Sequence, residues 1–515
     1  MVTLLAKGDV SMLSKITEQL KQKLIADLNE RVEDQIIERT NADLLVKLIQ
    51  KADTADEAVS IAELGTTYKR TGFHFDKRLD KVQTSDTIRY LKKNEALSFT
   101  DGFDKPHNKL IIGDNYDALQ NLLIEYKHSI DVIYIDPPYA MDDKGEYAQT
   151  NYENAITRDN LLSMLYPRLI LARELLTEEG VIFCSIDDRN QAYVKGLFDE
   201  VFGERNFIMC FAVIRAEGGG MAKQVIKGHD YCLAYARNIQ NFVPLAKEKD
   251  VRGKIIERNG HKYWIQEDWL RKEFGKYGNC HYEELIEYKG DEFKRKIDEG
   301  IKEGDYVLIP KDNGLHVIGK LRDLEKDSSK FYSVLKHLNK DGVNEIAELG
   351  LNFDYPKPVS LVEELVRGAT FFNPNAIILD FFAGSGTTGQ AVLAVNKEDD
   401  GDRQFILCTN NEITDTTPNG IALDVTTKRM KRVMTGSCYD GTSDFPWIKD
   451  HESLGGSLDV YDIGEVANFE NNEGKTPFDV IDETAYDKEF DNIEDKINWV
   501  CENFDRTQKT LGGED

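Results

Sequence analysis

The chain has 515 residues, of which 41% are hydrophobic and 30% charged, and its net charge is -27. The length predicts about three domains, and the composition excludes collagen-like and wholly disordered proteins. No apolar run approaches the roughly 18 to 20 residues that span a membrane, and the amino terminus lacks the pattern of a signal peptide. We therefore expect a globular protein of the cytoplasm that has no membrane partner.

The negative charge is unevenly distributed along the chain. Residues 451–515 hold 5 Lys and Arg against 18 Asp and Glu, whereas residues 211–350 hold 25 against 24. Nucleic-acid binding is driven by clustered Lys and Arg, so the overall charge argues against a nucleic-acid partner. Because the acidic residues are concentrated near the C-terminus, the near-neutral middle of the chain can still form a local basic groove.

Cysteine and histidine spacing gives no sign of a metal site. The seven cysteines never form a CxxC pair, and the nine histidines form no HxxxH or HExxH motif. Structural zinc sites bring such ligands together at short spacing. We expect reduced thiols, as in a cytosolic protein, and no bound metal.

The first elements expected along the chain are helices. Apolar residues such as Leu20, Leu24 and Leu28 recur at helical spacing between residues 11 and 64, which is typical of a packed helix face. In residues 65–78 basic side chains then alternate with aromatic ones, a composition that suits contacts with phosphates and bases. A solvated loop with buried aromatic side chains is the more common reason for such a stretch, and both interpretations stay open.

From Lys109 onward, short β-rich apolar runs alternate with helical segments in two blocks. We expect strands at residues 109–113, 131–135, 181–186, 376–380 and 404–408. We expect helices at residues 117–126, 158–176, 359–367 and 387–396, the second of which contains Pro167. Such alternation predicts a parallel α/β sheet. The alternation of strands and helices is lost at residues 240–349, which predicts an inserted domain there.

The first chemical motif, Asp136-Pro137-Pro138-Tyr139, directly follows a predicted strand. Open α/β sheets bind ligands at the carboxyl ends of their strands, and the two prolines make this turn rigid. A carboxylate, a fixed carbonyl of Pro137 and the flat face of Tyr139 suit a planar base that bears an exocyclic amino group. An ordinary turn is the alternative for an Asp-Pro-Pro sequence.

The second motif is a glycine-rich turn between a predicted strand and a predicted helix. Its glycines allow a tight turn and close approach of a ligand to the backbone. An acidic residue, Glu412, ends the next strand and could accept hydrogen bonds from ribose hydroxyls. The pattern also fits the dinucleotide fingerprint, so a nicotinamide cofactor stays open at this point. The residues of the turn are Asp380, Phe381, Phe382, Ala383, Gly384, Ser385, Gly386 and Thr387.

Together the two motifs resemble those of amino-methyltransferases that use S-adenosyl-L-methionine. Their order, with the catalytic motif first and an insertion between them, resembles the β class of DNA adenine N6-methyltransferases. Further segments are similar to the modification (Mod) subunits of type III restriction-modification systems, over about residue 60 to the C-terminus. These segments are residues 109–116, 157–168, 228–231 and 403–412.

The resemblance implies a role for each site residue. Asp136 and Pro137 would accept hydrogen bonds from the target amino group, and Tyr139 would stack on the base. The loop from Phe381 to Gly386 would hold the cofactor, and Glu412 would bind its ribose. In addition, Asp114 would lie near the adenine of the cofactor and Lys357 near its methionine end, although a loop-capping Asp and a surface Lys are equally good explanations.

The resemblance also implies a fold and a domain order. We expect a Rossmann-like, S-adenosylmethionine-dependent methyltransferase fold with an inserted target-recognition domain and an N-terminal helical region. The predicted parts are an N-terminal helical region (1–105), a catalytic half (106–239), the target-recognition domain (240–349), a cofactor-binding half (350–440) and an acidic C-terminal region (441–515).

The function implied is methyl transfer to N6 of a flipped-out adenine in double-stranded DNA. The resemblance further implies a homodimer and a restriction subunit as partners, although the compact insertion and acidic tail weaken the expectation of a restriction subunit. The alternatives are a solitary adenine or N4-cytosine methyltransferase, an enzyme acting on RNA, a non-catalytic nucleic-acid-binding subunit and a nicotinamide-dependent oxidoreductase. Asp136 at the head of the first motif favours adenine, because Ser is usual there in N4-cytosine enzymes.

Overall fold

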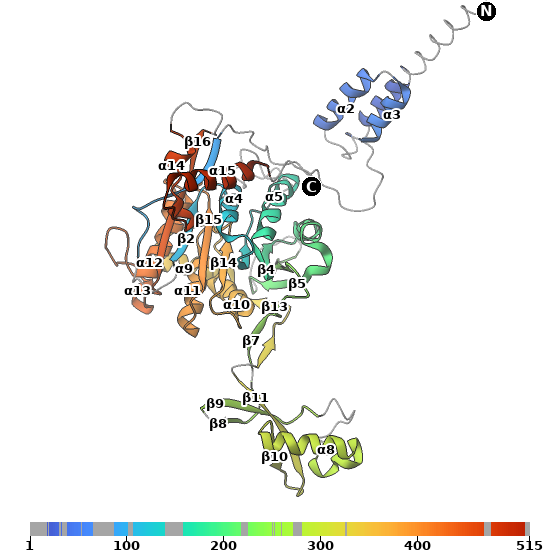
Figure 1. Ribbon diagram of the computed structural model, residues 1–515, viewed down its shortest axis with the longest axis vertical. Helices are drawn as coiled ribbons and strands as arrows, with labels where there is room; N and C mark the ends of the chain where they lie inside the picture. The colour runs from blue at the N-terminus through green and yellow to red at the C-terminus, as the bar shows by residue number, and fades with distance from the viewer. Residues whose placement is uncertain are drawn as a thin grey trace, which may run out of the picture. The chain divides into compact units, whose positions relative to one another are not determined.

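The computed structural model in Figure 1 divides the chain into two compact units, residues 1–74 and 75–515. No helix in the described part of the chain is long and apolar enough to cross a membrane. The described residues are 18, 20–29, 32, 39–52, 54–64, 87–100, 107–139, 158–217, 225–249, 251, 253–258, 260–270, 281–324, 327–467 and 475–509.

The described part of the first unit is helical, as predicted. Residues 20–29 form a helix, followed by α2 (Arg39–Lys51) and α3 (Ala55–Leu64). Leu28, Ile49 and Ala58 are buried together, so the apolar spacing marks a small internal core. The basic and aromatic stretch at residues 65–78 lies outside the described residues.

The second unit is built on a ten-stranded sheet. Its strands, in spatial order, are β1 (Thr87–Lys93), β16 (Ser457–Ala467), β2 (His107–Ile112), β15 (Gln404–Thr409), β14 (Ile377–Asp380), β3 (Ile130–Ile135), β4 (Leu176–Ile186), β6 (His229–Ala236), β5 (Phe207–Ile214) and β13 (Val334–Lys336). The strands from β16 to β4 run parallel, which confirms the predicted parallel α/β sheet. β6 is antiparallel to both β4 and β5.

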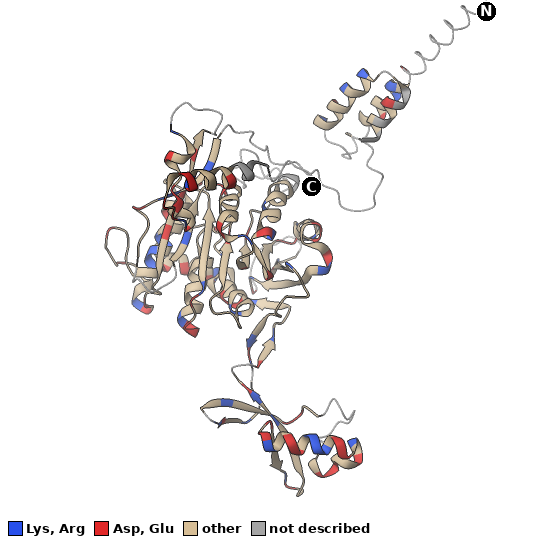
Figure 2. Ribbon diagram, viewed as in Figure 1, with Lys and Arg blue, Asp and Glu red and all other residues tan. Residues whose placement is uncertain are grey.

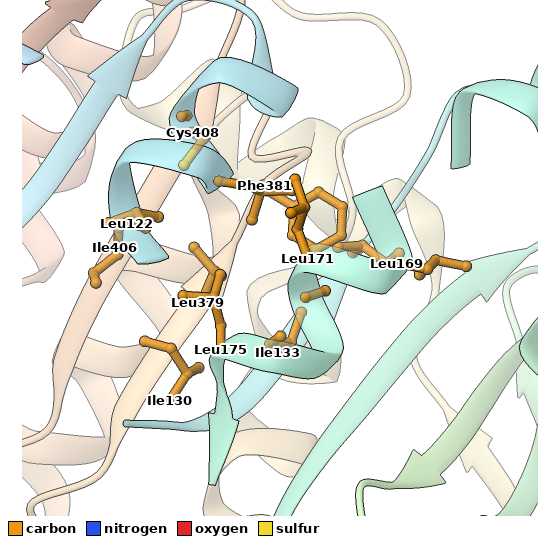
Figure 3. Close-up of a cluster of buried hydrophobic side chains, with 14 of the residues drawn as sticks. Leu122, Ile130, Ile133, Leu169, Leu171, Leu175, Leu379, Phe381, Ile406 and Cys408 are labelled. Atoms are coloured by element: carbon orange, nitrogen blue, oxygen red, sulfur yellow. The ribbon is translucent and has the colours of Figure 1, made fainter. Parts of the chain in front are cut away.

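Alternate residues of each strand point to opposite faces of this sheet. Both faces carry apolar side chains, and helices cover them on both sides. On β3, Ile133 and Ile135 face the cluster that includes α4, α5 and α6, part of which Figure 3 shows. Val132 and Tyr134 face the opposite cluster, which includes α10, α11 and α12. The helices are α4 (Asn115–Tyr126), α5 (Arg158–Leu175), α6 (Gln191–Phe198), α9 (Asn339–Glu348), α10 (Val359–Ala369), α11 (Thr387–Asp399), α12 (Thr427–Thr435), α13 (Trp447–Asp450), α14 (Pro477–Val480) and α15 (Ile493–Lys509).

The predicted insertion contains two small sheets of its own. One pairs β7 (Ala246–Glu248) with β12 (Ser328–Lys330), where the chain enters and leaves the insertion. The other holds β10 (Tyr306–Pro310), β11 (His316–Asp323), β9 (His261–Gln266) and β8 (Ile255–Arg258), and α8 (Leu285–Glu303) packs against it. Because β13 pairs with β5 of the large sheet, the insertion is narrower than the expected residues 240–349.

Both ends of the second unit contribute strands that the sequence analysis did not anticipate. Residues 87–93, expected in the N-terminal helical region, form β1, and the acidic C-terminal region supplies β16 between β1 and β2. In β16 the acidic Asp459 alternates with the fully buried Leu458 and Val460. This region therefore contains a strand in which buried and acidic side chains alternate, although its net charge did not indicate one.

Tyr486 ties the C-terminal region to the sheet. Its buried hydroxyl donates to Oδ1 of Asn121 on α4 at 2.6 Å and accepts a hydrogen bond from the backbone N–H of Leu91 on β1 at 2.8 Å. Its ring packs against Trp499 and Phe504 of α15. One side chain thus joins the N-terminal strand, a central helix and the C-terminal helix.

Tyr486→Phe should lower the free energy of unfolding by about 1–3 kcal/mol, because two buried polar groups lose their partner. Tyr439→Phe is the matched control. The Tyr439 hydroxyl also donates a hydrogen bond, to the backbone carbonyl of Leu97, but it is exposed, so its loss should cost about 0.5 kcal/mol or less. Urea unfolding followed by circular dichroism measures both. Equal costs for the two substitutions would show that Tyr486 does not hold these elements together.

Candidate active site

The predicted site residues gather at one edge of the large sheet. Asp136 follows β3, Asp380 ends β14, Glu412 follows β15 and Asp114 follows β2. These four strands are parallel neighbours in the order β2, β15, β14, β3, so their carboxyl ends lie at the same edge. This is the edge at which open α/β sheets bind their ligands.

The Lys357 ammonium connects the two residues of the first motif. Its Nζ lies 3.1 Å from Oδ1 of Asp136 and donates to the hydroxyl oxygen of Tyr139 at 2.8 Å. The Tyr139 hydroxyl in turn donates to Oδ1 of Asp136 at 3.1 Å. The resulting triangle holds the Tyr139 ring and the Asp136 carboxylate in a set geometry. Lys357 was expected near the methionine end of the cofactor, and in the structure its ammonium contacts the catalytic motif.

Burial dominates the electrostatics of this triangle. It raises the pKa of Asp136, and the Lys357 charge and the hydrogen bonds from Lys357 and Tyr139 only partly offset it. Burial also raises the pKa of Tyr139 well above its usual value, so the phenol stays protonated and remains a donor. Lys357 is therefore what favours the ionised form of Asp136.

The glycine-rich turn requires its glycines. Gly384 and Gly386 have φ of 47° and 79°, values that other residues rarely adopt. A Cβ at Gly386 would lie 3.2 Å from Cγ2 of Thr426, whereas at Gly384 the nearest atom would be Cζ of Phe353 at 3.4 Å. A side chain at Gly386 would thus press against the underlying α12 region, and one at Gly384 would have more room.

Asp380 supports this turn from within. Its carboxylate accepts hydrogen bonds from the backbone N–H of Phe382 at 2.9 Å and from the Thr388 hydroxyl at 2.5 Å. The side chain is almost fully buried, and burial raises its pKa to about 7. In this structure Asp380 therefore shapes the turn and links it to the first turn of α11.

A polar chain from α4 and α5 supports the other side of the turn. Asn115 Nδ2 donates to the carbonyl of Phe381 at 2.7 Å and its Oδ1 accepts from Arg168 Nε. Arg168 also pairs with Asp114 at 3.0 Å, and Asp114 caps α4 by accepting from the Tyr116 N–H. The capping role that the sequence allowed for Asp114 is thus present.

Arg429 on α12 lies buried beneath the turn, and no sequence motif indicated it. Its guanidinium donates to the Thr387 hydroxyl at 2.9 Å, to the Ser385 hydroxyl at 3.2 Å and to Gln390 at 2.8 Å. Burial lowers its pKa to about 10. A helical Arg is expected at the surface, so only the tertiary structure shows that it braces the turn.

The two motifs are also joined directly. The Thr387 hydroxyl donates to the backbone carbonyl of Lys357 at 3.3 Å, while the Lys357 side chain contacts Asp136 and Tyr139. The catalytic motif and the glycine-rich turn therefore form one connected site.

Residues 130–415 match the family described as DNA methylase (N6_N4_Mtase), a match that covers more than half of the chain. The chain belongs to this DNA methylase family. Membership confirms the resemblance to DNA amino-methyltransferases and, with the parallel sheet, the predicted Rossmann-like fold. Residues 14–131 match a second family, described as an uncharacterised conserved protein.

Relatives of this DNA methylase come from type III and type II systems. The StyLTI Mod subunit of Salmonella typhimurium is 31% identical over 387 residues, which are 64% of this chain and 57% of that protein. The EcoPI Mod subunit of Escherichia phage P1 is 26% identical over 504 residues, 76% of each chain. The type II methyltransferase M.KpnI of Klebsiella pneumoniae is 30% identical over 354 residues, 60% of this chain and 82% of that protein. The chain thus spans little more than half the length of the first relative.

Asp380→Asn should remove a pH-dependent loss of stability. Since the pKa of Asp380 rises from 3.8 to about 7 on folding, the folded protein keeps a proton that the unfolded chain releases as the pH rises through this window. The free energy of unfolding of the wild type should therefore fall, relative to that of Asp380→Asn, between about pH 4 and pH 7. Urea unfolding at several pH values measures this difference.

Asp188→Asn is the control for that titration. A hydrogen bond from Lys227 lowers the pKa of the half-exposed Asp188, so its replacement should give a small trend of the opposite sign. A difference between wild type and Asp380→Asn that does not change with pH would contradict the raised pKa.

Proposed function

We propose that this DNA methylase transfers a methyl group from S-adenosyl-L-methionine to N6 of an adenine flipped out of double-stranded DNA. The observation that carries the proposal is the site itself, in which the Asp136–Tyr139–Lys357 triangle stands beside the glycine-rich turn. An acceptor, an aromatic face and a backbone cradle meet at one sheet edge. Family membership supports the same reaction.

The first motif serves as the pocket for the target base. A base inside a duplex cannot reach it, so the base must be flipped out, at a cost of about a few kcal/mol. The Asp136 carboxylate and the Pro137 carbonyl would accept the two amino hydrogens, which localises the nitrogen lone pair for attack. Tyr139 would stack on the base, its ring oriented by the hydrogen bonds of its hydroxyl to Asp136 and Lys357.

The glycine-rich turn has the features that a nucleoside cofactor requires. Positive φ at Gly384 and Gly386 would let the backbone approach a ligand closely. The buried Glu412, three residues after β15, would accept hydrogen bonds from the ribose hydroxyls. When bound, S-adenosylmethionine supplies a methyl group on a positively charged sulfur. The turn from Phe381 to Thr387 would hold it, braced by Asp380, Asn115 and Arg429.

We propose adenine rather than cytosine as the target base because of the first residue of the first motif. Asp136 heads this motif, where Ser is usual in N4-cytosine enzymes. The matched family includes N6 and N4 methylases by its name, so the choice between the two bases rests on Asp136.

We further propose that the protein is the modification subunit of a type III restriction-modification system in the cytoplasm. The StyLTI and EcoPI relatives are Mod subunits of such systems, which supports a restriction subunit as a partner. A homodimer is proposed on the family resemblance alone. A solitary methyltransferase is the second candidate, favoured by the likeness to M.KpnI, 82% of whose length is aligned.

The insertion between β7 and β12 is proposed to read the bases around the target. The target pocket would bind only the flipped-out base, so other side chains must contact the neighbouring bases. In the insertion, Lys294 lies 3.6 Å from the Tyr282 ring centroid and Lys320 lies 5.6 Å from that of Trp269. Along α8, Lys and Arg alternate with Asp and Glu (Figure 2). The sequence of the insertion also carries two basic clusters. Their members Lys254 and Arg258 are described, whereas Arg252, Arg271, Lys272 and Lys276 lie outside the described residues.

Asp136→Ala should abolish methyl transfer, with a rate at least about 1000-fold lower. Cofactor affinity should change little, because Asp136 faces the base rather than the glycine-rich turn. Transfer of radiolabel from S-adenosylmethionine to unmethylated phage DNA measures the rate, and titration calorimetry measures cofactor binding. A parallel loss of cofactor affinity would show that Asp136 binds the cofactor or supports the fold.

Exchanging the insertion for that of a relative should change which DNA sequence is methylated. The antiparallel pairing of Ala246 with Lys330 gives a junction where both chain ends can be spliced together, so residues 249–327 form the exchanged segment. Sequencing that detects methylated bases should show a new site with the same modified base. An active hybrid that still marks the original site would place recognition elsewhere in the chain.

A further inference from the structure

Asp230 lies near the target-base pocket because of the antiparallel direction of β6. Since β6 runs opposite to β4, its amino end lies at the sheet edge where β3 and β4 have their carboxyl ends. The register places Tyr231 opposite Ile186 on β4 and Cys184 of β4 opposite Ile135 on β3. Asp136 directly follows Ile135, and Asp230 directly precedes Tyr231. Both acids therefore lie just beyond the last paired residues, at the same edge of the sheet.

The two carboxylates also lie on the same face of the sheet. Tyr134 of β3 and Cys232 of β6 both belong to the cluster that α10 covers. Asp136 follows Tyr134 by two residues and Asp230 precedes Cys232 by two, so strand alternation directs both toward this face. The Lys357 ammonium approaches from the same face, because it immediately precedes α10.

One buried carboxylate oxygen of Asp230 accepts no hydrogen bond from the described residues. Oδ2 accepts a hydrogen bond from Arg215 at 3.1 Å, but Oδ1 has no hydrogen-bond partner among the described residues. The Lys227 ammonium lies 4.0 Å from Oδ1, beyond hydrogen-bond distance, and also pairs with Asp188. Asp230 is only 6% exposed, and a buried unpaired carboxylate oxygen is rare enough to need an explanation.

We infer that Asp230 is a second acidic group of the target-base pocket, whose unpaired oxygen stabilises the positive charge that the target amino nitrogen acquires during methyl transfer. The inference rests on the proposed function. Asp136 cannot balance this positive charge alone, because Oδ1 of Asp136 already interacts with the Lys357 ammonium and the Tyr139 hydroxyl.

The charge balance of the reaction explains why a second carboxylate is useful. The nitrogen lone pair forms the new N–C bond while the C–S bond breaks and its electron pair goes to sulfur, so the positive charge moves from sulfur to nitrogen. The nitrogen then releases a proton to Asp136, which passes it to water. Burial is the main cause of the raised pKa of Asp136, and the Asp230 charge adds to it, which makes Asp136 a better proton acceptor.

Asp230→Asn, which preserves shape and removes the charge, tests this inference. Single-turnover transfer from labelled S-adenosylmethionine to unmethylated phage DNA, with enzyme in excess, should slow by about 100-fold. Binding of DNA and of cofactor, measured separately, should change by less than about threefold. Asp230→Glu, which restores the charge, should recover part of the rate.

Two further variants separate this role from a structural one. Asp188→Asn removes the exposed carboxylate that shares Lys227 and should leave the rate within about threefold of wild type. Arg215→Gln breaks the ion pair but keeps the Asp230 charge, so transfer should persist. An unchanged rate in Asp230→Asn, equal slowing in Arg215→Gln, or a parallel loss of DNA binding would overturn the inference. A wild type that transfers no methyl group would refute the proposed function itself.

Discussion

The parallel pairing of β14 with β3 is the constraint on which the site depends. Ile378 and Leu379 pair with Val132 and Ile133, although the two strands are far apart in the sequence. Because the strands are neighbours with the same direction, the turn after β14 and the motif after β3 must emerge side by side. The large insertion can vary without disturbing this geometry, since its two ends meet at β7 and β12.

Buried charge is the second organising feature of the site. Lys357 holds Asp136 toward its ionised form against the effect of burial, while Asp230 acts in the opposite direction on the same carboxyl. The Asp136 carboxyl is thus favoured in its ionised form while its pKa stays raised. Both properties suit a group that would first accept a hydrogen bond and then a proton. Arg429 plays a purely supporting part, because its hydrogen bonds all go to the turn and to Gln390.

The sequence was informative where chemistry and periodicity are local. Strands β2, β3, β14 and β15 and both motifs could be predicted, since each depends on a short run of residues and its period. β16 was missed because its acidic residues alternate with the buried Leu458 and Val460 inside an acidic region. The contact of Lys357 with Tyr139 spans 218 positions, and nothing near either residue indicates it. For Asp230, only strand register and burial distinguish it from a surface acid.

The most direct test of the account is the identity of the modified nucleoside. Unmethylated phage DNA would be incubated with the purified protein and S-adenosylmethionine, digested to nucleosides and analysed by mass spectrometry. We predict N6-methyladenine that accumulates with time and is absent when the protein is omitted. N4-methylcytosine in its place would contradict the target assigned to Asp136, and DNA without any methylated nucleoside would contradict the proposed activity.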